Sequence, residues 1–521
     1  MTAKTRYDYL SSERTQFLDE AEQAAELTLP YLIIKDDYSK GMRHLPTPWQ
    51  SVGAKGAVTL ASKLMLAMLP VQTSFFKLQV DESQLGEQFG PQVKSELDLS
   101  FAKIERTILE AIAASNDRVV VHEALLHLVV AGNALIFMGK EGLKLYPLNR
   151  FVVERDGNGN VIEIVTKETL AKKLIADQLP EDILKDYNSV VDSSPENVEE
   201  CDIYTHITRD NNRYVWHQEV HVKILEKSYG KAPVDITPWI PLRFNSVDGE
   251  DYGRGRVGQF IGDLKSLEAL SQALVEGSAA AAKVVFTVSP SSTTKPSTLA
   301  NAGNGAIVQG RPDDIGVVQV GKTADFRTAF EMMQQLERRI NDAMLVMQVR
   351  QSERTTAEEV RLTQMELEQQ LGGLFSLLTT EFLLPYLNRI LNQFQKTGKI
   401  PRLPKDIVKP TIVAGVNALG RGQDRESLGQ FLTVISQTMG PEAVQKFINP
   451  EEVIKRLAAS QGIDVLNLVR SMQEIQGQEQ QAQQMAMQQQ QADQQTAMMK
   501  TPMMDPSKNP ALAEQMQAPT E

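Results

Sequence analysis

The clearest candidate for chemistry in this sequence is a match to the phosphate-binding loop pattern G-x-x-x-x-G-K-[ST]. The letters GVVQVGKT fill this pattern over residues 316–323. In a working nucleotide site a buried strand precedes the first glycine, so that backbone N–H groups of the loop can surround a phosphate at a helix N-terminus. Here the strand-forming residues lie inside the loop, and a polar turn precedes it. We therefore expect a strand that runs into a helix instead of a nucleotide site.

Two weaker patterns have equally ordinary explanations. Residues 253–258 fit the dinucleotide pattern G-x-G-x-x-G, but a polar loop precedes them where a strand is required, so a loop-to-helix turn is expected. Residues 156–160 begin like a calcium-binding loop. That loop needs glycine at its sixth position and glutamate at its twelfth, where this chain has Val161 and Lys167, so we predict a hairpin turn.

The histidines do not form a convincing metal site. His122 and His127 point to different sides of a predicted helix, whereas His217 and His221 share one face of a predicted strand but lack a third ligand. Serine, cysteine and histidine show no arrangement typical of an activated nucleophile. We therefore predict that this protein is not an enzyme and that it uses no cofactor and no metal.

The composition is that of an ordinary globular chain with ample core material. The 521 residues are 42% hydrophobic and 23% charged, and this length exceeds one hydrophobic core, so two or more packed units are expected. A single cysteine, Cys201, excludes an internal disulfide framework and fits a reducing compartment. The N-terminus lacks the apolar segment of a secretion signal.

The net charge and the hydropathy of the sequence argue against two classes of binding partner. The formal net charge of −12 argues against tight, non-specific binding of duplex DNA over a broad basic face, although nucleic acid could still slide past such a surface. The two most apolar stretches, 58–69 and 119–138, do not suit a membrane. The first is too short, and the second contains charged and polar residues, so no membrane partner is expected.

The elements that must position any site are organised around two long helices within residues 326–399. The first has apolar residues at spacings of three, four and seven: Phe326, Phe330, Met333, Ile340, Met344 and Met347. A polar hinge at 349–354 follows it. The second helix opens at 355–359 with a capping pattern and has bend points at the glycines 372–373 and at Pro385. Helices of this length are expected to pack against several neighbours.

The remainder of the chain alternates between helical and strand periods, which predicts a mainly α fold with β hairpins (α+β). Helices are predicted at 9–34, 49–69, 92–115, 118–132 and 258–282, the last ending in small side chains that allow close helix contact. Strands are predicted at 135–137, 143–146, 151–153, 161–164, 284–288, 306–309 and 317–320, with a further hairpin at 203–224 that turns at 210–212. Residues 180–200 are polar and expected at the surface. A compact helical unit is predicted beyond the prolines at 401–410, up to residue 475, and a Gln-, Met- and Ala-rich tail at 476–521.

Short segments spread along the chain carry a resemblance to one protein family. They are TPWQSVGAKG at 47–56, LASKLMLA at 60–67, LVVAGN at 128–133, YGR at 252–254, GRPDDI at 310–315, TAEEVR at 356–361 and GRGQD at 420–424. Together they resemble the head-to-tail connector (portal) proteins of short-tailed bacteriophages, the podoviruses of the autographivirus kind. The likeness covers most of residues 1–475, thins at 170–235 and is only compositional in the tail.

What the resemblance implies for the fold is the portal architecture, in which subunits form a ring, usually a dodecamer. The implied segments are a wing at 1–258, stem helices at 259–282 and 324–346, a clip at 283–323, a tunnel loop at 347–354, a long wing-to-crown helix at 355–399, a crown at 400–475 and a low-complexity C-terminal tail or barrel at 476–521. This order agrees with the pattern of helices and strands described above.

What the resemblance implies for function is a channel at one vertex of the capsid, through which genomic double-stranded DNA is packaged and later ejected. Terminase and then tail adaptor proteins would dock on the clip, and the major capsid and scaffolding proteins would contact the homo-oligomer. The protein would be located in the virion after assembly in the host cytoplasm. Two alternatives stay open: a structural scaffold or tail component without a channel, and, more remotely, a P-loop nucleotide-binding enzyme.

The resemblance also implies which residues meet the DNA. The tunnel loop would project into the channel at its tightest point, where Arg350 and Arg354 could contact phosphate and Glu353 would lower the local charge. The alternative is that both arginines pair with acidic groups of a neighbouring stem helix, such as Glu331, Glu337 or Asp342.

Overall fold

The computed structural model describes residues 2–34, 45–70, 74–80, 91–171, 200–220, 223–282, 285–291, 295–303, 315–318, 323–346, 371–403, 408–412 and 431–438, with a few isolated residues between and after them. Contacts divide the chain into two units, Met1–Ala418 and Leu419–Glu521, and almost all described residues belong to the first. Among the described helices, none has an apolar stretch long enough to cross a membrane.

Four helices occupy the first part of the chain: α1 (Ala3–Glu26), α2 (Val52–Met68), α3 (Pro91–Ala114) and α4 (Asp117–Ala131). Three of them lie close to their predicted positions, but the prediction of 9–34 for the first is wrong at both ends. α1 begins at Ala3 because the Thr2 hydroxyl caps it by accepting a backbone N–H at 3.2 Å. It ends at Glu26, and Pro30, four residues later, has no N–H to donate to the Glu26 carbonyl, so that helical hydrogen bond is missing.

Two antiparallel sheets follow. The three-stranded sheet has the order β10-β2-β3 and consists of β2 (Asn133–Met138), β3 (Leu143–Tyr146) and β10 (Trp239–Arg243). The larger sheet has the order β4-β5-β6-β7-β8, with β9 also paired to β7. Its strands are β4 (Phe151–Arg155), β5 (Val161–Ala171), β6 (Glu200–Asp210), β7 (Arg213–Val220), β8 (Lys223–Ile224) and β9 (Gly230–Pro233). Short 3-10 helices are η1 (Leu148–Arg150), η3 (Glu226–Ser228) and η4 (Val234–Ile236).

The turns of the larger sheet confirm the sequence predictions. β6 and β7 are joined at Asn211 and Asn212, and Asn211 has the positive φ of 53° that this residue type tolerates in tight turns. In the turn at 156–160, the Asp156 carboxylate accepts two backbone N–H bonds at 2.9 and 2.8 Å. That turn is therefore a hairpin, as expected. Residues 180–199 of the predicted surface segment lie outside the described part of the chain.

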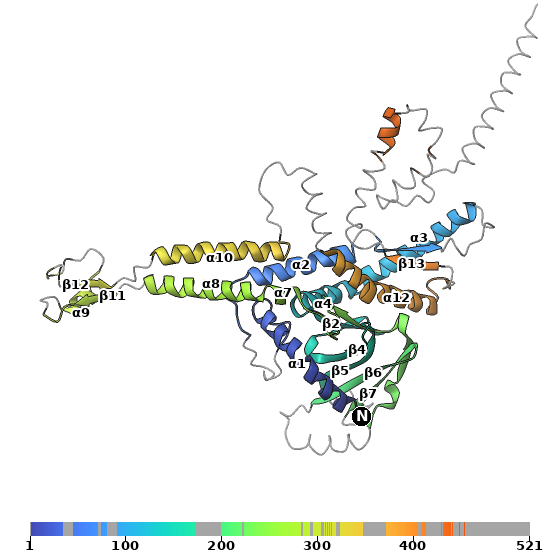
Figure 1. Cartoon of the computed structure of the whole chain (residues 1–521), viewed down its shortest axis with the longest axis horizontal. Helices are drawn as coiled ribbons and strands as arrows, with labels where there is room; N and C mark the ends of the chain where they lie inside the picture. The colour runs from blue at the N-terminus through green and yellow to red at the C-terminus, as the bar shows by residue number, and fades with distance from the viewer. Residues whose placement is uncertain are drawn as a thin grey trace, which may run out of the picture. The chain divides into compact units, whose positions relative to one another are not determined.

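α1 lies against the larger sheet (Figure 1). Its Tyr7 and Leu10 join a small apolar cluster with Val152, Val165 and Tyr204 of the sheet. The tyrosine rings of α1 and β6 pack edge to face, with centroids 5.6 Å apart. The N-terminal helix is therefore part of the fold and covers one face of the sheet.

A second set of elements follows the sheets along the chain: α7 (Arg256–Gln259), α8 (Ile261–Ala282), β11 (Val285–Val288), α9 (Pro296–Ala300), β12 (Ile315–Val318) and α10 (Thr323–Ala343). The helix predicted at 258–282 is in fact two helices that meet at Phe260, where glycines on both sides weaken the helix. The strand predicted at 306–309 is wrong for Ile307 and Gln309, which lie in irregular chain.

The described part of the helix predicted at 355–399 contains a change of helix type. Residues 371–378 are α-helical and continue through the π-helical turn η6 (Thr379–Leu383) into α12 (Leu384–Lys396). The π turn lies directly before Pro385, a predicted bend point, which has no N–H to donate to the preceding turn.

Beyond α12 the chain returns to the N-terminal part. β13 (Val408–Ile412) pairs antiparallel with β1 (Phe76–Val80), and Phe76 lies opposite Ile412. The chain therefore forms a strand at the predicted proline break, and the helical unit predicted beyond residue 410 is wrong for residues 411 and 412, which end this strand. The β-branched residues at both ends of β13 favour a strand, and Pro410 in its middle disfavours a helix.

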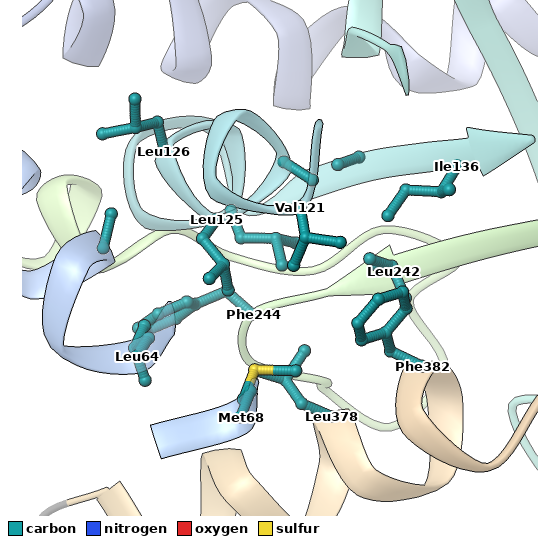
Figure 2. Packing of buried hydrophobic residues seen from close by; sticks show 14 of the residues in the cluster. Leu64, Met68, Val121, Leu125, Leu126, Ile136, Leu242, Phe244, Leu378 and Phe382 are labelled. Carbon is teal, nitrogen blue, oxygen red and sulfur yellow. The ribbon is translucent and has the colours of Figure 1, made fainter. Parts of the chain in front are cut away.

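One apolar core joins α2, α4, the three-stranded sheet and the helix at 371–396 (Figure 2). The side chains labelled in that view come from all of these elements, namely Leu64, Met68, Val121, Leu125, Leu126, Ile136, Leu242, Phe244, Leu378 and Phe382. Because these residues are far apart in the sequence, the core links the N-terminal helices to the helix at 371–396. We call α1–α4, α7, the three-stranded sheet, the larger sheet, the loop at 244–255 that joins β10 to α7, and the helix at 371–396 the body.

Candidate functional site: the α8–α10 hairpin and its base

α8 and α10 pack side by side and antiparallel, forming a helical hairpin that leaves the body (Figure 1). At its base the Arg339 guanidinium pairs with the Asp263 carboxylate at 2.9 Å. Toward its far end a Cβ built on Gly277 would lie 2.6 Å from the Phe326 ring, so only glycine allows this approach. The close helix contact predicted from the small residues of α8 is confirmed at this position.

The apolar stripe predicted for α10 is only partly covered by α8. Ile340 is fully buried, whereas the side chain of Phe330 is 48% exposed. Met332 of α10 and Val275 of α8 are 52% and 53% exposed. The hairpin of a single chain therefore presents large apolar side chains that its own residues do not cover, a pattern typical of a contact surface.

The strands β11 and β12 pair with each other between the two helices. Their pairing shows which structure the start of the phosphate-loop pattern adopts. Gly316, its first glycine, lies within β12 opposite Thr287, whose hydroxyl donates to the Gly316 carbonyl at 3.1 Å. A phosphate loop needs that glycine after a strand, where backbone N–H groups are free to bind phosphate. The chain then reaches α10 at Thr323, so the strand that runs into a helix is confirmed, while residues 319–322 lie outside the described part.

The base of the hairpin is where α10 ends against α2 and α7. The Arg256 guanidinium of α7 donates from Nε and Nη2 to the Ala343 carbonyl at 3.2 and 3.0 Å. The Lys63 ammonium of α2 donates to the Leu345 carbonyl at 2.5 Å. Both cations therefore meet the negative end of the α10 dipole.

The glycines of the dinucleotide-like pattern serve close backbone packing. A Cβ on Gly132, whose φ is +77°, would lie 2.5 Å from the Gly255 nitrogen. The Asn133 side chain donates to the Gly253 carbonyl and accepts its N–H, both at 2.7 Å. α7 begins directly after Gly255, so the predicted loop-to-helix turn is confirmed. These contacts fix the start of α7, from which Arg256 reaches the hairpin.

A buried network of charges ties the helix at 371–396 to the sheets. The Glu381 carboxylate, in the π turn η6, accepts from Arg243 Nη2 at 2.6 Å and from Nε at 3.0 Å. Arg155 Nη1 lies 3.6 Å from the same carboxylate. Burial lowers the pKa of the Arg155 guanidinium to about 10, although Glu381 opposes that change. The π turn thus places one carboxylate beside both arginines, and Arg155 also donates to the backbone carbonyls of Asp251, Gly159 and Pro241.

The histidines take structural positions in the body. His127 is buried in α4, and burial lowers its pKa to about 4, so its ring is neutral near pH 7. His217 Nε2 lies 3.0 Å from a Glu219 carboxylate oxygen, whereas His221 is outside the described residues. In the part of the chain that the structure describes, no three His, Cys, Asp or Glu side chains are grouped to hold a metal ion.

The three predicted channel residues, Arg350, Glu353 and Arg354, lie outside the described residues, so their contacts stay a prediction. Of the acidic side chains considered as alternative partners, Glu331 pairs with Arg327 of its own helix at 3.1 Å. Sequence reasoning missed Lys63 and Arg256. The signal for Lys63 was a lone cation inside the apolar stretch 58–69, a placement that requires a specific partner.

Comparison with known proteins agrees with the resemblance of the short segments. Residues 1–468 match the model of a family described as bacteriophage head to tail connecting protein. The portal protein of Enterobacteria phage T3 is 38% identical over 487 residues, which cover 91% of this chain and 89% of that protein. The portal protein of Escherichia phage T7 is 37% identical with the same coverage, and that of Enterobacteria phage SP6 is 30% identical over 85% of each chain.

Among solved structures, a chain from the neck of an empty GTA particle matches 80% of this chain and 90% of its own. Its sequence identity of 13% and TM-score of 0.40 are too low to support an argument. The family match and the portal relatives are sufficient by themselves. The chain belongs to the family of bacteriophage head to tail connecting proteins, the portal proteins.

Proposed function

We propose that this portal protein forms a closed ring, a dodecamer as is usual in the family, whose axial channel passes double-stranded DNA during packaging and ejection. Membership of the family supports a connector between head and tail. The ring would occupy one vertex of the capsid in the virion, after assembly in the host cytoplasm. Neighbouring subunits, the major capsid protein and scaffolding protein would cover surfaces that the single chain leaves open.

The observation that carries the proposal is the uncovered apolar surface of the α8–α10 hairpin. Val275 lies on one helix and Phe330 and Met332 on the other, and all three are about half exposed. In a closed ring each hairpin has a neighbour on both sides, so a head-to-tail contact covers such side chains without leaving an open edge. The hairpin helices would then be the stem of the ring.

Imaging of the purified full-length protein tests the ring, and a matched pair of variants tests the contact. Negative-stain electron microscopy should give rings with an axial hole. Val275→Glu should shift sedimentation toward monomers, because it places a charge in the subunit contact. Val247→Glu, at a valine of the body that is 43% exposed, should leave the rings intact. Monomers at every concentration would contradict the ring, and a closed assembly without a hole would favour the alternative of a structural component without a channel.

Within this ring the segments keep the roles implied by the family. Residues 283–323 would be the clip on which terminase and then tail adaptor proteins dock, and the two-stranded sheet between α8 and α10 supports a separate docking element there. The wing would span 1–258, the long helix 355–399 would lead to a crown at 400–475, and 476–521 would extend as a tail or barrel. The pairing of β13 with β1 ties residues 408–412, at the start of this proposed crown, to the N-terminal part of the chain.

The tunnel loop at 347–354 would bring Arg350 and Arg354 to the DNA, with Glu353 between them. Each exposed arginine–phosphate contact is weak and screened by salt, which suits a sliding duplex. Replacing both arginines by alanine should leave rings and empty proheads normal, while filled heads retain less DNA. If the double variant fails to form rings, the arginines are structural and do not contact DNA.

We also propose that the portal works without catalysing a reaction of its own. The strand pairing of Gly316 supports this, because it places the first glycine of the pattern within a strand, where a phosphate loop needs it after one. The purified ring should therefore not hydrolyse ATP. Hydrolysis that disappears in Lys322→Ala would restore the P-loop alternative.

A further inference from the structure

The end of α10 has an unusual backbone. The helix closes with N–H bonds from Met344 to Ile340 and from Val346 to Asn341, at 2.9 and 2.8 Å. Between them Leu345 has a φ of +55°, in the left-handed region. A branched, bulky side chain rarely adopts that conformation. The Leu345 N–H donates to the Asp342 carbonyl at 3.1 Å, and contacts from other parts of the chain add to this bond.

Two cations from distant parts of the chain supply such contacts. Arg256 donates twice to the Ala343 carbonyl, and Lys63 donates to the carbonyl of Leu345 itself. The last carbonyls of a helix have no partner within the helix, so each is a strong acceptor with partial negative charge. The two side chains thus bind the residues on both sides of Met344.

Residues of α2 also pack against the end of α10. Met344 is fully buried, and a Cβ on Gly56 would lie 2.8 Å from its Cγ. Burial also lowers the pKa of the Lys63 ammonium, which indicates that this cation gives up part of its hydration there. An ammonium in that position needs the Leu345 carbonyl to replace lost water contacts.

We propose that Lys63 and Arg256 are positioning residues that fix the end of α10 at residues 343–346, where the chain leaves the hairpin. The two side chains work from α2 and α7, so the body determines where α10 stops and in which direction the chain continues. The consequence for the DNA channel rests on the proposed function, because the chain continues from there toward the tunnel loop. The contacts of Lys63 and Arg256 with the end of α10, which we call the clamp, do not depend on that function.

Amide hydrogen exchange of the purified full-length protein tests the clamp in Lys63→Met with Arg256→Met. A hydrogen bond to a charged group contributes about 1.5–3 kcal/mol, which corresponds to about a 10- to 100-fold change in an opening equilibrium. The amides of Met344, Leu345 and Val346 should therefore exchange about 10 to 100 times faster. Amides of the first half of α10 should keep their protection. Lys265→Met is the matched control, because its ammonium donates to the exposed Gln23 side chain, at 2.9 Å.

Two further variants separate positioning from general stability. Lys63→Arg keeps the charge and should retain most of the protection at residues 344–346. Leu345→Gly, combined with Lys63→Met, should recover part of the protection, because glycine adopts a positive φ without strain. The proposal would be overturned if amide exchange is unchanged in Lys63→Met with Arg256→Met. It would also be overturned if the exchange rate rises equally along the whole of α10. Because exchange is measured without DNA, this result is independent of whether the channel proposal survives.

Discussion

The body and the α8–α10 hairpin use the same residue types in different ways. Phe382 in the body is 1% exposed and packs on helices and strands that are distant in the sequence, whereas Phe330 in the hairpin is about half exposed. Both phenylalanines lie on helices with a regular apolar period. The body therefore completes its own core, while the hairpin has one covered side and one side whose apolar residues stay exposed in the single chain.

Charged groups differ between the two regions in the same way. In the body, Glu381 and Arg243 form a buried pair with several hydrogen bonds. In the hairpin, the pairs Arg327–Glu331 and Arg339–Asp263 lie at the surface. A buried pair is expensive to break because one charge is left without a partner, while an exposed pair contributes little. The hairpin is therefore more tolerant of substitution than the body, except where subunits touch.

The largest expected effect comes from matched truncations of the two phenylalanines. Phe382→Ala should lower the free energy of unfolding by about 3–5 kcal/mol, because it leaves a cavity in the core. Phe330→Ala should change it by less than about 1 kcal/mol, yet weaken subunit association. Urea denaturation measures the first quantity and sedimentation velocity the second. Equal losses of stability in both variants would remove the distinction between a complete and an incomplete surface.

Acid is expected to have a smaller effect. It should lower the free energy of unfolding of the body by about 3 kcal/mol. The pKa of His127 falls from its ordinary value of 6.5 to about 4 in the fold. Below pH 6.5 the unfolded chain binds a proton at this ring and the native chain does not, so stability declines as the pH falls from 6.5 toward 4.

Denaturation at several pH values checks this prediction against His127→Leu, which has no proton to bind. The variant should lose that part of the pH dependence. If the free energy of unfolding of the variant falls with pH as steeply as that of the natural sequence, the acid sensitivity comes from other groups. The α8 and α10 segments contain no histidine, so local opening of the hairpin should not follow the same pH dependence.

The smallest effect concerns the ion pair at the base of the hairpin. A double-mutant cycle of Arg339→Ala and Asp263→Ala should give a coupling energy of about 0.2–1 kcal/mol, and 0.5 M salt should reduce it. Thermal unfolding of the four variants provides the measurement. A coupling above about 2 kcal/mol would mean that the pair is shielded from water, for example by a neighbouring subunit.

The class of fold, most of the described helices and strands, and the failure of the nucleotide patterns could be predicted from the sequence alone. Local signals were sufficient there: apolar periods for α2, α3 and α4, turn residues for the β6–β7 hairpin, and a misplaced strand for Gly316. Family membership could also be predicted, because short segments from TPWQ to GRGQD resemble the family whose model matches the chain. Errors arose where a cap or a proline set the limits of an element, as in α1, and where a long-range partner selected a strand, as in β13.

The contacts between residues that are distant in the chain depend on the folded structure and could not be predicted from the sequence. Lys63 and Arg256 come from different helices, and nothing in their local sequence indicates that both contact the end of α10. The same holds for Gly132 beside Gly255 and for Glu381 beside Arg243, because such contacts depend on the three-dimensional packing of the body. The helical period likewise did not predict that Phe330 is exposed. Such a period gives the direction of a side chain but not the neighbour that covers it. A periodic pattern depends on near neighbours in the chain, whereas the clamp, the glycine contact and the open face of the hairpin depend on residues brought together by folding.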